Sequence, residues 1–243
     1  MQLEGRTAIV TGASSGIGAA TVRKLREAGV RVAGGARRVE RVEADVALPL
    51  DVTDPRSCET FAAEAVAALG GGVDILFNNA GLALGRSPFT ESTEEDEASV
   101  LHTNVDGLLR MTRLCLPHIR DGGHIVNMGS IAGRQAYPNG AVYVASKFAV
   151  RGFTYALRED LLGRPIRITT VDAGLVETEF SVVRFRGDES AAKAVYEGLE
   201  PITPEEVADC VMFALTRPPH VNIDELVIKA LAQSSGARIH RGG

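Results

Sequence analysis

The sequence contains few cysteines and no recognisable metal-binding pattern. Three cysteines stand far apart and form no CxxC pair, which argues against a disulfide framework and favours buried thiols in a reducing compartment. The five histidines show no ligand spacing, and there is no HExxH motif, so we expect no catalytic metal. The cysteines are Cys58, Cys115 and Cys210, and the histidines are His102, His118, His124, His220 and His240.

Long apolar runs and excess positive charge are also absent. No apolar run approaches the ~20 residues that span a bilayer, and the opening "MQLEGRTAIVTG" runs straight into a predicted strand without a leader pattern. We therefore expect a cytoplasmic protein that does not bind membranes. A formal net charge of −5 argues against a general binder of nucleic acid. Basic residues gather only between Arg23 and Arg41, which suits one anionic ligand.

Short β-branched runs alternate with amphipathic stretches along the chain. This order predicts βαβ units, and strands that are apolar throughout suggest a sheet covered on both faces. We predict an α/β fold with a doubly wound, mostly parallel sheet of Rossmann type, about seven strands and a single domain over residues 1–243. The acidic run at 91–97 is interpreted as a capped helix start rather than a metal site. The predicted strands cover 7–10, 30–34, 46–50, 73–78, 124–129, 166–171 and 222–230, and the helices 17–28, 58–69, 93–118, a stretch around Tyr143, and 204–215.

A glycine-rich turn links the first strand to the first helix. "TGASSGIG" (11–18) has glycines at 12, 16 and 18, which allow a tight turn and leave the helix N-terminus free for a pyrophosphate. Such a turn alone is weak evidence, but strand, turn and helix occur in the order that a dinucleotide site requires. The absence of a GK[ST] ending argues against an ATPase.

The end of the second strand indicates which dinucleotide binds. NAD enzymes usually have an acidic residue here for the ribose hydroxyls, whereas this chain has Ala36, Arg37 and Arg38. A guanidinium fork suits a 2′-phosphate, so we favour NADP(H), although two solvated arginines would look the same. Asp51, after the third strand, is a candidate acceptor for the adenine amino group or a turn residue.

Tyr143 and Lys147 lie four residues apart on one predicted helix. This spacing places both side chains on one helical face, which fits a proton-transfer pair and equally fits a polar helix edge. A free phenol has a pKa of about 10, and a nearby ammonium favours the phenolate.

Four further motifs accompany the glycine-rich turn: "NNAG" (78–81), Asn104 in "HTNVDG", Ser130 in "NMGSIAG", and "YVASK" (143–147). Together, in this order, the five motifs give the chain a specific resemblance to the short-chain dehydrogenase/reductase family. The resemblance implies that Tyr143 exchanges a proton with the substrate oxygen, that Lys147 supports it and holds the nicotinamide ribose, and that Ser130 binds the substrate oxygen. It further implies that Asn104 helps to hold a relay water. The implied cofactor-binding residues are Gly12, Ser14, Ser15, Gly16, Ile17, Gly18, Arg37, Arg38, Asp51, Val52, Asn79, Ala80, Gly81, Tyr143, Lys147, Gly174, Val176 and Thr178.

The C-terminal third resembles one branch of that family, the NADP-dependent 3-hydroxy acid (serine-type) dehydrogenases that also reduce malonic semialdehyde. "TEFS", "VRF", "TPE" and "HVNI" occur in the order typical of that branch. The resemblance implies a small hydroxy acid or semialdehyde substrate, a homotetramer, and residues 175–200 as a substrate-covering segment. Arg184, Arg186 and Arg241 are candidates for binding a substrate carboxylate, and the tail with Arg241 could reach a neighbouring subunit.

Other functions stay open. The enzyme could be a ketoreductase for a larger or non-acidic carbonyl, including sulfoacetaldehyde-type or natural-product ketones, and a non-catalytic NADP(H) redox sensor is the alternative of another class. Two departures from the family pattern stand out. Ala173 replaces the usual proline before Gly174, and the segment between Arg41 and Val46 is too short for the usual helix.

Overall fold

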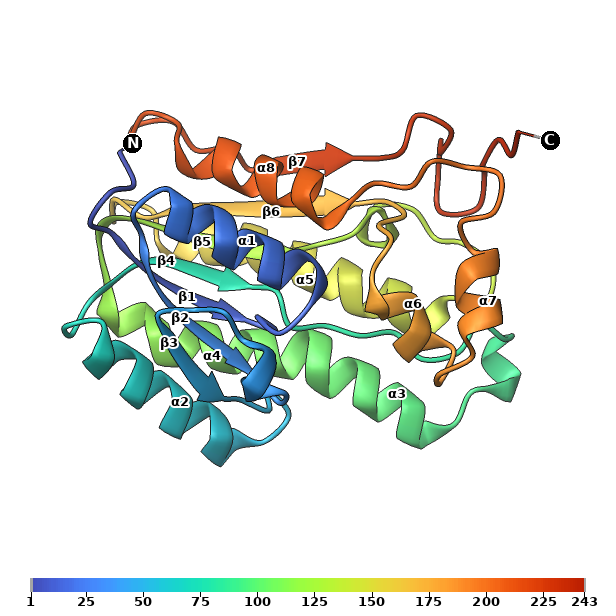
Figure 1. Cartoon of the computed structure of the whole chain (residues 1–243), viewed down its shortest axis with the longest axis horizontal. Helices are drawn as coiled ribbons and strands as arrows, with labels where there is room; N and C mark the ends of the chain where they lie inside the picture. Colours follow the sequence, from blue (N-terminus) through green and yellow to red (C-terminus); the bar gives the residue numbers. More distant parts are fainter. Residues whose placement is uncertain (1, 243) are drawn as a thin grey trace.

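The computed structural model describes residues 2–242 and contains one seven-stranded sheet in the order β3-β2-β1-β4-β5-β6-β7 (Figure 1). Every pair of neighbouring strands is parallel. This confirms the predicted Rossmann-type α/β fold, with a sheet that is parallel throughout. The strands are β1 (Thr7–Thr11), β2 (Arg31–Ala36), β3 (Val46–Pro49), β4 (Val73–Asn78), β5 (Ile119–Met128), β6 (Arg167–Ala173) and β7 (Glu225–Ile228).

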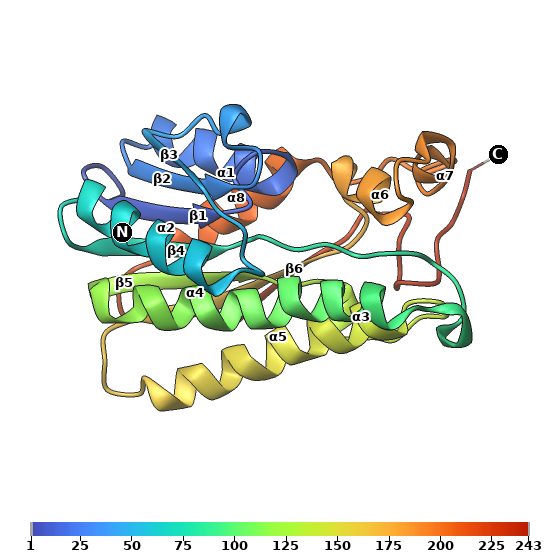
Figure 2. The same cartoon turned by 90° about the horizontal axis from the view of Figure 1, so that it is seen from below.

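Helices cover both faces of the sheet (Figure 2). Alternate residues of a strand point to opposite faces, and both faces are apolar: Ala8 and Val10 pack in the core beneath α1 and α8, whereas Ile9 packs in the core beneath α2, α4 and α5. The first face carries α1 (Gly16–Glu27) and α8 (Pro204–Leu215), and the second carries α2 (Pro55–Ala68), α3 (Glu94–Leu101), α4 (Gly107–Cys115) and α5 (Ala141–Asp160).

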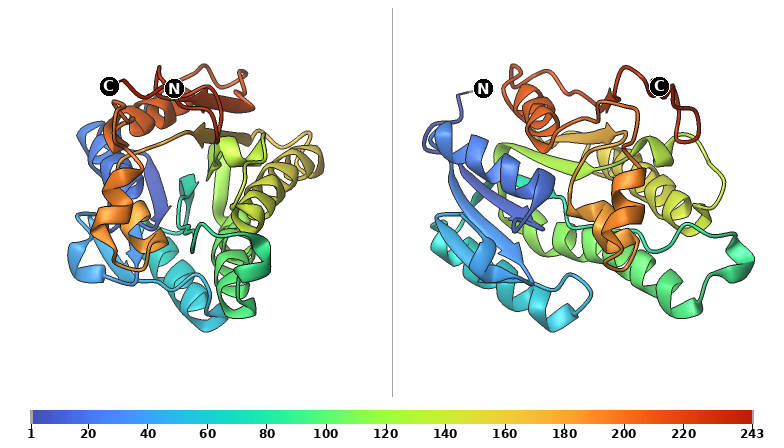
Figure 3. Two further views of the ribbon diagram at one scale, coloured as in Figure 1. Left: turned by 90° about the vertical axis from the view of Figure 1, so that its right-hand side faces the viewer. Right: turned by 45° about the vertical axis from the view of Figure 1, so that its right-hand side comes forward.

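Two short helices, α6 (Glu179–Arg184) and α7 (Glu189–Ala194), lie beyond the carboxyl ends of the strands (Figure 1). Viewed from that edge, they face the α3 and α5 side of the molecule across the strand ends (Figure 3). Both lie within the segment 175–200 that follows β6.

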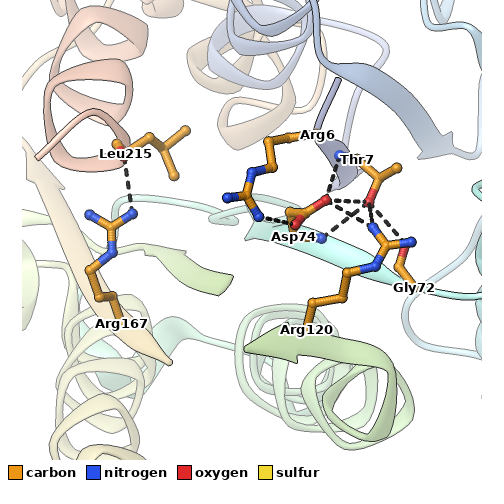
Figure 4. Close-up of polar contacts among 7 residues, drawn as sticks. All are labelled: Arg6, Thr7, Gly72, Asp74, Arg120, Arg167 and Leu215. Atoms are coloured by element: carbon orange, nitrogen blue, oxygen red, sulfur yellow. Dashed lines mark hydrogen bonds and ion pairs between the residues drawn. The ribbon is translucent and has the colours of Figure 1, made fainter. Parts of the chain in front are cut away.

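The amino edge of the sheet is held by a charged cluster around Asp74 (Figure 4). The Asp74 carboxylate accepts hydrogen bonds from Arg6 at 2.6 Å, from the Thr7 amide at 2.9 Å and from Arg120 at 2.9 Å. Burial acts to raise the pKa of Asp74, but the hydrogen bonds from Arg6 and Thr7 outweigh it and lower the pKa. The cluster ties the starts of β1, β4 and β5 together, at the edge opposite the site described below.

Several sequence-based expectations are refined by the structure. Thr93 caps α3 by accepting from the Asp96 amide, as the interpretation of the acidic run required. The last strand begins at Glu225 rather than at 222, because the Asn222 side chain takes the place of a backbone pair by bonding both the amide and the carbonyl of Ile168.

Between β2 and β3 the chain forms only the single 3₁₀ turn Val39–Arg41, in keeping with the shortened segment. Cys58 and Cys115 are buried and Cys210 is half-buried, all three as free thiols. Within residues 2–242 no helix has the length and apolarity to cross a membrane, and no group of His, Cys, Asp and Glu side chains is arranged to hold a metal ion.

Candidate active site

The carboxyl ends of the central strands border a cavity of about 550 Å³. The strand order reverses between β1 and β4: β2 and β3 follow on one side of this pair, and β5, β6 and β7 on the other. Doubly wound folds bind ligands at this switch point, and the cavity lies there. Every residue that the sequence assigned to the cofactor lines this cavity except Gly18. Ser130 and Arg184 also line it, whereas Asn104 and Arg241 do not.

The glycine-rich turn packs so closely that side chains are excluded. Gly12 has a φ of +67°, and a Cβ there would lie 2.9 Å from the Cα of Ala80. A Cβ on Gly18 would lie 2.2 Å from the carbonyl oxygen of Gly12, so this glycine lets α1 pack against the turn. Asn79 fixes the turn from β4 by donating to the carbonyls of Thr11 and Gly12 at 3.0 and 3.1 Å. Ser15, the N-cap residue of α1, makes no side-chain capping bond, so the amides of the first helical turn are available to a pyrophosphate at this end of the cavity.

Two arginines follow β2 and differ in their contacts. The exposed Arg37 side chain lines the cavity and makes no hydrogen bond or ion pair with any residue in 2–242. Arg38 donates to the Ser15 hydroxyl at 3.2 Å and to Glu179 at 2.6 Å. Arg41 donates to the other oxygen of Glu179 at 2.8 Å. The sequence reasoning did not foresee this carboxylate.

Asp51 lines the cavity and also forms the turn that the sequence left as an alternative. Its Oδ1 accepts from the amide and the hydroxyl of Thr53 at 2.9 and 2.7 Å. Burial acts to raise the pKa of Asp51, but the Thr53 hydrogen bonds outweigh it and lower the pKa. The carboxylate is therefore ionised and held in one orientation at the cavity wall.

These features fit NADP(H). The uncapped α1 end and the bare turn would take the pyrophosphate, and Arg37 offers an unpaired guanidinium where a 2′-phosphate would lie. Ala36, Arg37 and Arg38 stand at and directly after the end of β2, where an NAD enzyme usually has an acidic residue for the ribose hydroxyls.

Three polar side chains meet at the other end of the cavity. Ser130 follows β5 and accepts the Ala132 amide at 3.1 Å, which fixes its hydroxyl at the start of a 3₁₀ turn. Tyr143 and Lys147 share one face of α5, as their spacing predicted. The Lys147 Nζ lies 5.8 Å from the centre of the Tyr143 ring and donates to the Met128 carbonyl at 2.9 Å.

Burial dominates the protonation of this group. It raises the pKa of Tyr143 to about 12, with Tyr137 adding to the rise and a hydrogen bond with Ser130 opposing it. Burial likewise lowers the pKa of Lys147 to about 8. In the protein on its own the pKa of the phenol is thus raised, not lowered as the sequence analysis expected, because loss of hydration outweighs the Ser130 hydrogen bond and the Arg184 charge.

Asn104 lies in a π-helical segment, His102–Asp106, that joins α3 to α4. Such bulges often mark functional sites. Its amide nitrogen donates to the Leu82 carbonyl at 2.8 Å and to the Ser146 hydroxyl at 3.0 Å, and its oxygen accepts the Leu82 amide. A Cβ on Gly81 would lie 3.2 Å from that oxygen and 3.7 Å from the Lys147 Nζ. The Asn104 oxygen and the Lys147 Nζ thus both lie close to Gly81.

A partly buried charge network links β6, β7 and α5. Asp172, at the end of β6, accepts from Arg134 at 2.6 Å, and Arg134 also pairs with Glu225 on β7. Glu225 in turn accepts from Arg151 of α5 at 2.6 Å. The Asp172 charge acts to raise the pKa of Lys147, in opposition to burial.

The substrate end of the cavity is bordered by residues from α6 and the loop after β5. The Arg184 guanidinium lies 5.8 Å from the centre of the Tyr143 ring and donates to the Gly85 carbonyl at 3.0 Å. Phe180 packs edge-on against Tyr143, with ring centres 5.7 Å apart, and Tyr137 bonds Arg184 through its hydroxyl.

Sequence reasoning did not assign several residues to the cavity, because their positions there depend on how distant segments pack. The polar and aromatic ones are Arg86, Thr103, Tyr137, Glu179, Phe180, Ser181, Phe185, Tyr196 and Gln233.

The other two candidate arginines lie elsewhere. Arg186 pairs with Asp96 on the exposed side of α3. Arg241 donates to the carbonyls of Val195 and Glu197 of its own chain and lies outside the cavity.

The loop after β6 is held without the usual proline. The Gly174 amide donates to the Ile228 carbonyl at 2.8 Å, and the Leu175 amide donates to Gln233 at 2.9 Å. A Cβ on Gly174 would lie 2.1 Å from that Gln233 oxygen, so the C-terminal segment closes over the loop. These contacts restrain the backbone next to Ala173.

Comparison with known proteins agrees with this geometry. The short chain dehydrogenase family matches residues 6–188. An NADP-dependent 3-hydroxy acid dehydrogenase of Schizosaccharomyces pombe is 40% identical, over 99% of this chain and 98% of the relative. Serine 3-dehydrogenase of Agrobacterium fabrum is 38% identical, over 97% of this chain and 98% of the relative. A closed form of serine dehydrogenase complexed with NADP⁺ superposes with a TM-score of 0.91 at 40% identity, covering 97% of this chain and 99% of that one. These similarities confirm both levels of the sequence resemblance, and the chain belongs to the short chain dehydrogenase family.

Proposed function

We propose that the protein transfers a hydride between NADP(H) and a small 3-hydroxy acid such as serine, or the corresponding semialdehyde. The observation that carries the proposal is the meeting of Ser130, Tyr143 and Lys147 at one end of a cavity whose other end presents Arg37 and no ribose-binding acid. The names and high coverage of the relatives support the same substrate class.

When bound, NADPH would supply the hydride. Ser130 orients the carbonyl oxygen, since its hydroxyl is fixed at the cavity wall. Tyr143 donates a proton from its Oη to that oxygen as the alkoxide forms; with a pKa of about 12, the phenol holds this proton throughout the neutral range. Lys147 lies 5.8 Å from the centre of the ring, stabilises the phenolate left behind and returns a proton to it, while Asn104, also close to Gly81, would help to hold a relay water.

A carboxylate substrate needs a cation near the reacting carbon. Arg184 fits this role because its guanidinium lies over Tyr143 while only part of its donor set is used by Gly85 and Tyr137. Arg86 lines the same cavity without a partner among residues 2–242. We propose Arg184 as the main carboxylate ligand, within a substrate-covering segment 175–200 of a single-domain enzyme.

We further propose a homotetramer that works in the cytoplasm. Exposed apolar side chains on adjacent helices support an interface: Leu101 of α3 is 40% exposed, and Phe148 and Tyr155 of α5 are each 44% exposed. Free thiols suit a reducing compartment. Sedimentation velocity should show a smaller species for Phe148→Asp but not for Leu162→Asp, just beyond the end of α5. If both variants have the same mass as the wild type, the interface does not include this surface.

Turnover with a substrate panel tests the function. NADP⁺ reduction should be followed at 340 nm with serine and 3-hydroxypropionate, and NADPH oxidation with malonic semialdehyde, sulfoacetaldehyde and bulky ketones. Activity confined to the acidic substrates supports the proposal, whereas preference for a bulky neutral ketone would point to a ketoreductase. NADPH binding without turnover of any substrate would point to a redox sensor.

A further inference from the structure

Glu179 joins the two ends of the cavity. It is the first residue of α6, directly after Thr178, whose side chain caps the helix. Its carboxylate oxygens accept from Arg38 at 2.6 Å and from Arg41 at 2.8 Å. Both arginines belong to the segment after β2, on the far side of the nucleotide turn. The contact therefore ties the substrate-covering segment to the ribose end of the cofactor site.

The same short helix contacts the catalytic tyrosine. Phe180 packs against the Tyr143 ring, and Arg184 lies over the same ring. The helix is only six residues long, so a shift of its first residue moves these contacts as well. The other polar side-chain contacts of α6 among residues 2–242 are the hydrogen bonds of Arg184 with Gly85 and Tyr137 and one between Ser181 and Tyr196.

We propose that Glu179 is a positioning residue, which through Arg38 and Arg41 holds α6 over the bound cofactor and so keeps Arg184 and Phe180 against Tyr143. This inference rests on the proposed NADP(H) function. The proposal assigns separate roles to the basic residues after β2. Arg37 is available to the 2′-phosphate, whereas Arg41 does not line the cavity and acts only through Glu179.

Glu179 could also have the opposite effect on cofactor binding, and the two effects predict opposite changes when its charge is removed. A carboxylate between two arginines could repel a 2′-phosphate and weaken NADPH binding. The two arginines lower the pKa of Glu179, which therefore stays ionised near neutrality. If repulsion dominated, removal of the charge would tighten binding of NADPH but not of NADH. If holding α6 dominates, removal speeds dissociation of both.

The experiment compares two pairs of matched variants. Glu179→Gln removes both halves of the contact and Arg41→Gln removes one of them. As controls, Glu40→Gln, next to Arg41, and Arg31→Gln, at the start of β2, remove the same charges from exposed side chains that make no side-chain hydrogen bond or ion pair within residues 2–242. Stopped-flow measurement of NADPH release by its own fluorescence should show dissociation about 5- to 20-fold faster in the first pair and within twofold of wild type in the second.

Hydrogen exchange of the cofactor-free protein gives a readout that needs neither NADPH nor turnover. Amides of residues 179–185 should exchange about fivefold faster in Glu179→Gln than in wild type, with no change in Glu40→Gln. If the wild-type protein fails to bind NADPH, the proposed function is contradicted. The exchange experiment would still test whether the contact of Glu179 with Arg38 and Arg41 holds α6. Tighter NADPH binding in Glu179→Gln, or exchange and release equal to those of Glu40→Gln, would overturn the inference.

Discussion

Substituting Gly18 by alanine tests whether the nucleotide turn depends on close packing of α1. A new Cβ would lie 2.2 Å from the carbonyl oxygen of Gly12 and 2.5 Å from the Asn79 amide nitrogen, well short of the 3.4 Å at which ordinary contacts begin. The first turn of α1 must therefore move by roughly 1 Å, and the Asn79 hydrogen bond to Gly12 is strained or lost. Overpacking of this kind costs about 1–3 kcal/mol, and a lost hydrogen bond adds about 1 kcal/mol.

The matched control is Gly152→Ala. Gly152 lies inside α5, and a Cβ there would meet nothing within 4 Å. Alanine in a helix interior is better than glycine by about 0.5–1 kcal/mol, so this variant should be slightly more stable than wild type.

Urea unfolding should be followed by circular dichroism at 222 nm, since the chain has no tryptophan, and NADPH affinity by calorimetry. Gly18→Ala should lose on the order of 2 kcal/mol of stability and bind NADPH at least about tenfold more weakly. Gly18→Ala that matches Gly152→Ala in both stability and affinity would refute the packing argument.

Two further predictions concern the charges of Asp172 and Glu225. Asp172→Asn removes a charge that raises the pKa of Lys147. For carbonyl reduction, kcat/KM should fall at alkaline pH near the Lys147 pKa of about 8, and in the variant this fall should move to lower pH. A pH profile that does not move would contradict the interaction of Asp172 with Lys147. Burial acts to raise the pKa of Glu225, but hydrogen bonds with Arg151 and its neighbours lower it to about 2, so its stabilisation is complete above about pH 4.5 and fades as the pH falls toward 2. Glu225→Gln should thus cost on the order of 3 kcal/mol at pH 7 and about 1 kcal/mol less at pH 3.5 by urea unfolding; a cost independent of pH would show that charge is not the cause.

The sequence predicted those parts of the fold that depend on local patterns. Continuous apolar strands required two covered faces, and the structure has a core on each. The four-residue spacing of Tyr143 and Lys147 placed both on one side of α5. The cofactor residues could be assigned because they sit in motifs next to strand ends, where a parallel sheet gathers them.

What the sequence could not predict depends on contacts between distant segments. Glu179 lies 141 residues from Arg38, and nothing in either segment indicates the pairing. The charge of Asp172 under Lys147 depends on the register of β6 against β5. The raised pKa of Tyr143 follows from burial, which the spacing of two residues does not reveal.

Carbonyl reduction by Tyr143→Phe tests the central claim most directly. The substitution removes only the Oη, so the ring contacts with Phe180 and Arg184 are retained and the fold and cofactor site should be unaffected. With malonic semialdehyde and NADPH, kcat should fall by about 10³-fold, while the NADPH dissociation constant from calorimetry stays within about threefold of wild type. A variant with near-full activity would contradict proton transfer by Tyr143.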